Sequence, residues 1–125
     1  MTTSEAVMTT QDVANRMNEL FKESKWDQVQ DELYSEDCES IEPSHAQGLQ
    51  SVKGIAAIKK KGQDFNAMVE EMHDGWCSEP LVAGNYISFA MGMDATMKGM
   101  GRTKMDEICV YEVKDGKIVK EQFFF

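Results

Sequence analysis

The spacing of apolar residues along this chain changes near residue 70, and this change restricts the possible folds more than any other feature of the sequence. Before it, apolar residues recur three or four positions apart, as in Val13, Met17, Leu20 and Phe21, which is the spacing of an amphipathic helix. After it, apolar and polar residues alternate, as in residues 85–97, which is the spacing of a strand with one buried face. Helices followed by strands predict an α+β fold, with the helices packed on an antiparallel sheet.

The first part of the chain is divided into three helical segments. Amphipathic helices are predicted over residues 10–23, 26–34 and 54–70. A short strand, closed by Pro43, is expected over residues 38–43. On the third helix, Lys59, Lys60 and Lys61 are expected to form a solvated face.

The last two strands form the clearest hairpin. Strands are predicted over residues 72–78, 85–97, 103–113 and 118–125. The segment Lys114-Asp115-Gly116 is interpreted as a type I turn with glycine in the left-handed bulge position. This three-residue loop predicts one face that carries Glu107, Cys109, Tyr111, Val113, Val119, Glu121, Phe123 and Phe125. A two-residue loop would instead move Glu121 to the other face.

Size and charge exclude several classes of function. The chain of 125 residues is long enough for one domain, expected over residues 10–125 after a flexible tail at 1–9. A net charge of −9 disfavours nucleic acid and anionic membranes as partners. No apolar run reaches the ~18 residues of a membrane span, and the N-terminus lacks the signal-peptide pattern, so a cytoplasmic location is expected. The three cysteines and two histidines lack the paired spacing of zinc ligands, so no metal site is expected.

Several short pieces of the sequence, in their order, resemble the nuclear transport factor 2-like superfamily, which includes ketosteroid isomerases and SnoaL-type polyketide cyclases. These pieces are Trp26-Asp27, Leu33-Tyr34-Ser35-Glu36-Asp37, Ile41-Glu42-Pro43, Lys53-Gly54-Ile55-Ala56-Ala57-Ile58 and Asp115-Gly116-Lys117-Ile118-Val119. The resemblance covers nearly the whole chain. It implies a cystatin-like cone with a strongly curved sheet and an internal pocket. It also implies a homodimer through the outer sheet face and no cofactor.

Glu42 is the first candidate catalytic residue, on the strength of this resemblance. In ketosteroid isomerases, the residue before the matching proline is a carboxylate base that moves a proton beside a carbonyl. Here Glu42 precedes Pro43. A glutamate that is merely solvated at the end of a strand is the alternative.

Glu107 and Glu121 are the next candidates, because the hairpin places both on one mostly apolar face. Two carboxylates on such a face cannot both ionise at low cost, so either one is protonated or a cation lies between them. In the alternative, Arg102, Lys104 or a helix residue pairs with them.

A pocket in this cone would have an apolar lining. The side chains predicted to line it are Met17, Phe21, Trp26, Tyr34, Phe65, Phe89, Met91, Met93, Cys109, Tyr111, Phe123 and Phe125. Methionines also cluster in the sheet, and such a cluster fits either a ligand pocket or ordinary core. The positions that would supply oxyanion donors in a ketosteroid isomerase fall near Met17 and Cys109, which donate poorly or not at all. This disfavours steroid isomerisation.

Three hypotheses follow from these observations. The first is a pocket for a small apolar molecule with cofactor-free proton transfer of the isomerase or cyclase type. The second is a module that binds such a molecule without catalysis. The third is a dimeric interaction module whose working surface is the exposed sheet face around Ile108 and Val110.

Overall fold

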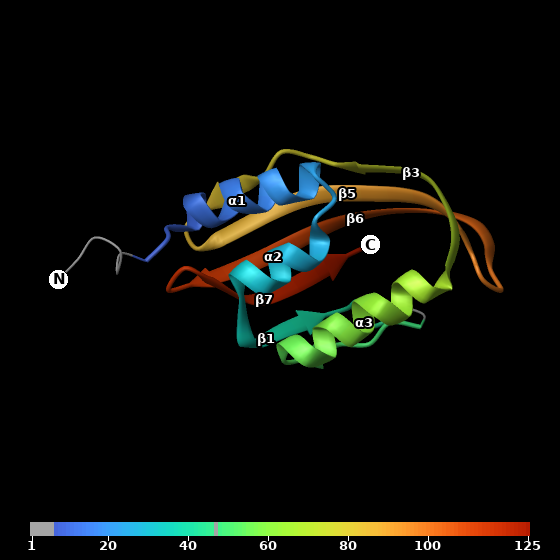
Figure 1. Ribbon diagram of the computed structural model, residues 1–125, viewed down its shortest axis with the longest axis horizontal. Coiled ribbons are helices and arrows are strands. Elements are labelled where there is room, and N and C mark those ends of the chain that lie inside the picture. Colours follow the sequence, from blue (N-terminus) through green and yellow to red (C-terminus); the bar gives the residue numbers. More distant parts are fainter. Residues whose placement is uncertain (1–6, 47) are drawn as a thin grey trace.

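The computed structural model describes residues 7–46 and 48–125, and these form three helices and one large curved sheet (Figure 1). The helices are α1 (Thr10–Lys22), α2 (Trp26–Leu33) and α3 (Ile55–Met68). The strands are β1 (Tyr34–Ile41), β2 (Val52–Lys53), β3 (Val69–Cys77), β4 (Leu81–Ala83), β5 (Tyr86–Met97), β6 (Gly101–Lys114) and β7 (Lys117–Phe124). Residues 1–6 of the predicted tail lie outside the described residues. None of the described helices is long and apolar enough to cross a bilayer.

The predicted α+β fold is confirmed, and the structure adds to it the short strands β2 and β4 and one parallel strand pair. The strand order is β2-β1-β7-β6-β5-β3, and β4 pairs with β5. Strands β1 and β7 are parallel, whereas the other neighbours are antiparallel, so the sheet is mixed. The long strands β3, β5 and β6 curve around α1 and α2, while α3 lies beside β1 (Figure 1). Pairing with β7 also explains why β1 begins at Tyr34, four residues before the predicted start at residue 38.

The β6–β7 hairpin corrects the predicted register. Its loop has two residues, Asp115 and Gly116, both with positive φ (52° and 76°), so Val113 pairs with Ile118 and not with Lys117. A bulge at Val119 then adds one unpaired residue to β7. The residues that follow it therefore point to the same faces of the sheet as the three-residue loop predicted.

As a result, Glu121 stays on the inner face, although it lies opposite Tyr111 and not opposite Cys109. Ile118, which is fully buried, takes the inner position predicted for Val119.

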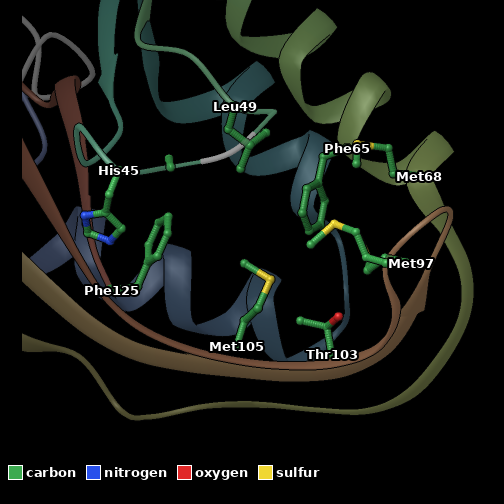
Figure 2. A pocket seen from close by; sticks show the side chains of 10 residues that line it. His45, Leu49, Phe65, Met68, Met97, Thr103, Met105 and Phe125 are labelled. Atoms are coloured by element: carbon green, nitrogen blue, oxygen red, sulfur yellow. The ribbon is translucent and has the colours of Figure 1, made fainter.

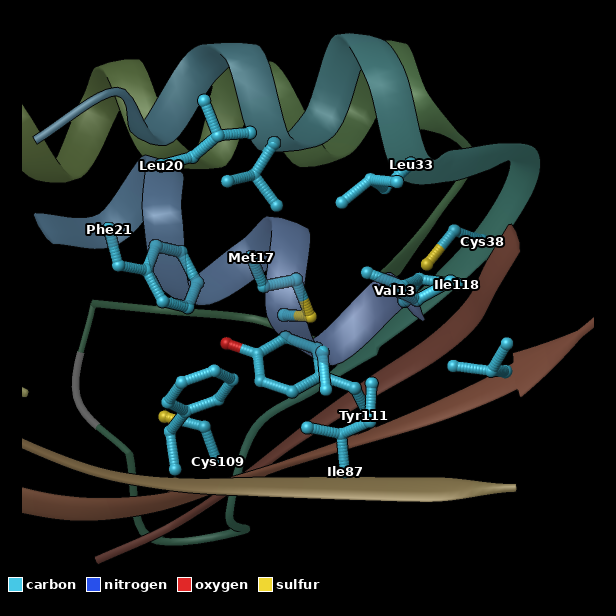
Figure 3. Packing of buried hydrophobic residues seen from close by; sticks show 14 of the residues in the cluster. Val13, Met17, Leu20, Phe21, Leu33, Cys38, Ile87, Cys109, Tyr111 and Ile118 are labelled. Carbon is cyan, nitrogen blue, oxygen red and sulfur yellow. The ribbon is translucent and has the colours of Figure 1, made fainter. Parts of the chain in front are cut away.

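The core lies between the first two helices and the inner face of the sheet (Figure 3). Helix α1 begins with a capping box in which Thr9 and Asp12 each accept a hydrogen bond from the backbone N–H of the other, both at 3.0 Å. The phenyl ring of Phe89 packs edge-on against the rings of Phe21 and Tyr111, with distances between ring centroids of 5.0 Å and 6.1 Å. These side chains fill the space beneath α1 and α2, so any open space must lie elsewhere on the inner face.

The outer face of the sheet exposes large apolar side chains. Trp76, Ile108 and Phe124 are 50%, 47% and 48% exposed, and Ile108 pairs directly with Phe124 across β6 and β7. This is the face that the superfamily resemblance assigns to a homodimer, and that assignment stays a prediction.

Gly92 on β5 provides a test of this packing, because it lies between Trp76 and Asp106 on the outer face. A Cβ at this position would overlap the indole of Trp76 and the carboxylate of Asp106. We therefore expect Gly92→Ala to lower the free energy of unfolding by about 1–3 kcal/mol in urea titrations. Gly75→Ala is the matched control, since its Cβ would meet the carbonyl oxygen of Gly92 at an ordinary 3.8 Å. Equal stability of both variants would contradict the prediction.

Candidate functional site

A cleft opens between α3, the loop that follows β1, and the inner face of β5 and β6. Its volume is about 220 Å³, and its lining is almost entirely apolar. Figure 2 shows the labelled side chains pointing into it from both walls. The lining residues are His45, Ala46, Leu49, Phe65, Met68, Met97, Met100, Thr103, Met105 and Phe125.

The structure distributes the predicted lining residues over several places. Phe65 and Phe125 line the cleft. Five of the others are buried in the core, namely Met17, Phe21, Phe89, Cys109 and Tyr111. Three are partly buried against that core, namely Tyr34, Met91 and Phe123. Trp26 is 46% exposed and stacks on Phe21, and Met93 borders a polar hollow with Trp76 and Asp94.

The cleft residues that the sequence prediction missed fall into two groups. Met97, Met100 and Met105 belong to the methionine cluster, which is a visible signal in the sequence. Leu49 lies in a loop without periodic pattern, so only the position of that loop against α3 brings it to the cleft. His45, in the same loop, is near Glu42 in the sequence, and this nearness predicts a place at the mouth of the pocket, where it lines the cleft.

A buried carboxylate, Glu121, anchors a polar network next to the core. Its side chain is 5% exposed, and it accepts hydrogen bonds from the Ser40 hydroxyl at 2.6 Å and from the Tyr34 hydroxyl. The parallel pairing of β1 with β7 places Ser40 directly opposite Glu121. Burial raises the pKa of Glu121, and the hydrogen bonds from Ser40 and Tyr34 partly offset this.

Lys61 connects this network to Glu42. Its ammonium donates to Ser40 Oγ at 2.6 Å and to Glu42 Oε2 at 2.7 Å, and it lies 5.5 Å from the centre of the Phe123 ring. The side chains of Lys61 and Glu42 are only 12% and 6% exposed. Glu42 is therefore a buried, ion-paired group and not a solvated strand end.

The prediction of a solvated lysine face on the third helix was wrong for Lys61. Lys59 and Lys60 do pair with acids in exposed positions, Asp31 and Asp64. Lys61 lies three residues after the buried Ile58 and four before Phe65, so it falls on the stripe of α3 that faces the sheet.

Glu107 has mainly apolar neighbours on the sheet. It pairs across the sheet with Met91, and on the same face of β6 it lies between Met105 of the cleft and Cys109 of the core. The hydrogen bond found at its carboxylate comes from the Cys109 thiol at 3.4 Å. Burial raises the pKa of Glu107. The charges of Glu42 and Glu121 raise it further, while the thiol and Lys61 act in the opposite direction.

The two basic residues that the sequence suggested as partners for Glu107, Arg102 and Lys104, lie on the outer face of the sheet. Arg102 binds Asp94 on the outer face, at 2.8 Å. Lys104 on β6 lies directly opposite Asp94 on β5, and it borders the polar hollow that Trp76 and Asp94 also line. The helix residue Lys61 is the cation that acts on the carboxylates.

The site thus combines three carboxylates with one ammonium group beside an apolar cleft. Burial is the main reason that the pKa values of Glu107 and Glu121 are raised, and the negative charges of the neighbouring carboxylates add to it. Such a group can hold a proton at a higher pH than an ordinary carboxylate and exchange it with a bound molecule. Within residues 7–46 and 48–125, no set of His, Cys, Asp and Glu side chains is arranged to hold a metal ion.

The Lys61–Glu42 pair gives a first test. Lys61→Met leaves the buried Glu42 without its cation, so we expect a loss of about 3–5 kcal/mol in the free energy of unfolding. The double variant Lys61→Met/Glu42→Gln should recover a large part of that loss, because no uncompensated charge remains. Lys60→Met serves as the control, because its exposed pair with Asp64 should contribute at most about 1 kcal/mol. A Lys61→Met variant as stable as Lys60→Met would refute the buried pair.

The raised pKa of Glu107 gives a second test. Because its folded-state pKa lies above the ordinary 4.5, the folded protein holds this proton more tightly than the unfolded chain does. The stability linked to the proton is present below the unfolded pKa and is lost as pH rises through the folded pKa. Glu107→Gln cannot ionise, so we expect it to be more stable than the wild type at neutral pH and similar to it in acid.

Urea titrations between about pH 4 and pH 8 measure this difference. Asp106→Asn, the outward-facing neighbour on β6, removes the same charge and should not reproduce the pH dependence. A Glu107→Gln variant that is less stable than the wild type at neutral pH would show that the Glu107 carboxylate is stabilised in the fold and not strained.

Comparison with known proteins identifies the family. The model of the SnoaL-like domain matches residues 8–125. The structure is similar to that of a candidate SnoaL-like polyketide cyclase (carbohydrate phosphatase) from Mesorhizobium loti, with 29% identity over 94% of this chain and 100% of that chain, and a TM-score of 0.87.

A nuclear transport factor 2-like protein of unknown function from Burkholderia pseudomallei has the same fold, with 16% identity over 94% of this chain and 92% of that chain, and a TM-score of 0.73. A protein with a cystatin-like fold from Xanthomonas campestris also matches, with 16% identity over 94% and 90% of the two chains, and a TM-score of 0.70. No protein with a curated description matches the sequence. The chain therefore belongs to the SnoaL-like domain family, within the nuclear transport factor 2-like superfamily.

Proposed function

We propose that this protein binds a small, mainly apolar molecule in the cleft between α3 and the sheet and transfers a proton on it without a cofactor. One observation carries the proposal, namely that two neighbouring carboxylates lie in opposite environments. Glu42 is paired with Lys61, whereas Glu107 lies among apolar side chains. Pairs of this kind divide into a base and an acid at one pH.

Each carboxylate has a distinct role in this proposal. Glu42, which accepts a hydrogen bond from the ammonium of Lys61, is the base. Glu107, whose pKa is raised by burial, is the acid, and it lies next to the cleft residue Met105 on the inner face of β6. Glu121 is linked to Lys61 through Ser40, so it sets the position and charge of the pair without contacting the ligand.

Binding without catalysis is the second candidate, and the state of the hydrogen-bond donors favours it. Tyr34 donates to Glu121, and Lys61 donates to Ser40 and Glu42. An enolate that developed in the cleft would therefore find these donors already engaged, and such a donor contributes about 3–4 kcal/mol in enzymes that use one.

Exchange of carbon-bound hydrogen in D₂O separates the two candidates. Hydrophobic ketones that raise the melting temperature would be incubated with the protein in D₂O, and deuterium uptake beside the carbonyl would be followed by proton NMR. Under the first candidate, Glu107→Gln and Glu42→Gln should each slow the exchange by about 100-fold or more. Glu107→Gln is the sharper variant, because it leaves the Lys61 pair intact.

Asp106→Asn is the control for lost charge and should exchange at the wild-type rate. Binding with no exchange above the buffer rate would favour the non-catalytic candidate. Exchange that survives in both glutamine variants would refute the assigned roles.

A further inference from the structure

The side-chain donors around the cleft are few and mostly engaged. Within residues 7–46 and 48–125, the lining side chains that carry a donor are His45 and Thr103. The Thr103 hydroxyl donates to the carbonyl oxygen of Gly101 at 3.3 Å. His45 is exposed, and its ring lies 5.6 Å from that of Phe125 at the rim. A carbonyl or carboxylate group of a ligand would thus find few hydrogen-bond donors at the inner end of the cleft.

A carboxylate with only a weak hydrogen bond, in contrast, lies close to the cleft. Glu107 lies directly beyond Met105 on the inner face of β6, and the hydrogen bond found at its carboxylate comes from a thiol, which is a weak donor. Glu42 and Glu121 already accept hydrogen bonds from Lys61, Ser40 and Tyr34, but their charges act on Glu107 and exceed the one positive charge of Lys61. The ligand group that complements this end is a donor, and the excess negative charge favours a cationic donor over a hydroxyl.

The walls of the cleft suit the same chemistry. Phe65 from α3 and Phe125 from the end of the sheet both direct their rings into the cleft (Figure 2). Aromatic faces attract an ammonium group through the ring quadrupole, and methionine side chains adapt to an apolar body. The volume of about 220 Å³ is suited to a compact body that carries one polar group.

We infer that the cleft selects a hydrophobic amine, whose ammonium group is bound by the carboxylate of Glu107 while its apolar body contacts Phe65, Phe125 and the cleft methionines. This inference rests on the binding part of the proposed function, which places a ligand in the cleft. It names the class of that ligand for the non-catalytic candidate, because a Glu107 carboxylate paired with an ammonium group has no proton to donate. The ion pair forms in either of two balanced ways. A neutral amine takes the proton of Glu107, so that an N–H bond forms as the O–H bond breaks, or an ammonium ion enters as that proton leaves to water.

Three probes of similar shape test the inference at neutral pH: phenethylammonium, phenethyl alcohol and phenylacetate. Titrations would be followed through the methyl signals of ¹³C-methyl-labelled methionine, because Met97, Met100 and Met105 line the cleft. We expect phenethylammonium to bind the wild type about tenfold more tightly than the alcohol, since a hydrogen bond to a charged group contributes about that factor or more. Phenylacetate should bind most weakly.

Glu107→Gln should abolish the preference for the ammonium while leaving the affinity for the alcohol within about twofold. Asp106→Asn, which removes an equal charge on the outer face, should keep the preference and so exclude a general effect of the net charge.

The outcomes separate the two proposals. Binding of the alcohol as tight as that of the ammonium, or a preference that survives in Glu107→Gln, would overturn the amine inference and leave the cleft proposal standing. Methionine signals that no probe shifts would overturn the cleft proposal itself, and the amine inference with it.

Discussion

In the described part of the chain, the ammonium group of Lys61 is the cation placed among three carboxylates of the inner sheet face, and the site depends on it. It contacts Glu42 and Ser40 directly, and its charge lowers the pKa values of Glu107 and Glu121. Removing a cation from a buried pair leaves an uncompensated charge, which costs more than the pair contributes. The position of α3 over the sheet and the arrangement of the carboxylates are therefore coupled.

The division of the inner face into two parts follows from the same architecture. Helices α1 and α2 cover one part, which is filled by side chains of the helices and of the sheet, such as Met17 and Tyr111 (Figure 3). Helix α3 covers the other part and leaves the cleft open, with Lys61 one helical turn before Phe65. Glu107 lies at the boundary between the two parts, because its neighbours on the inner face of β6 are Met105 of the cleft and Cys109 of the core. Burial in this setting raises the pKa of its carboxyl group.

The sequence predicted the fold class and the inner-face positions of Glu107 and Glu121 better than it predicted which side chains line the cleft. Alternation along the hairpin was enough to place Glu107 on the inner face, but Glu121 reached that face by a different route. The short turn and the bulge at Val119 each changed the side-chain parity, and the two changes cancelled. The superfamily resemblance marked Glu42, although its pairing with Lys61 was not foreseen. Met17 and Phe21 were expected at the ligand and are core, because helix amphipathicity shows that a side chain is buried and not what covers it.

Local and periodic properties were thus determined by the sequence alone: helices before residue 70, strands after it, the hairpin, and the inner face of β6. Contacts between segments that are distant in the chain were decided only by the tertiary structure. Ser40 meets Glu121 through the parallel pairing of β1 with β7, and Lys61 meets Glu42 through the packing of α3. The physical reason is that periodicity reports which side of an element is buried, whereas the partner of a buried charge depends on how whole elements are packed together.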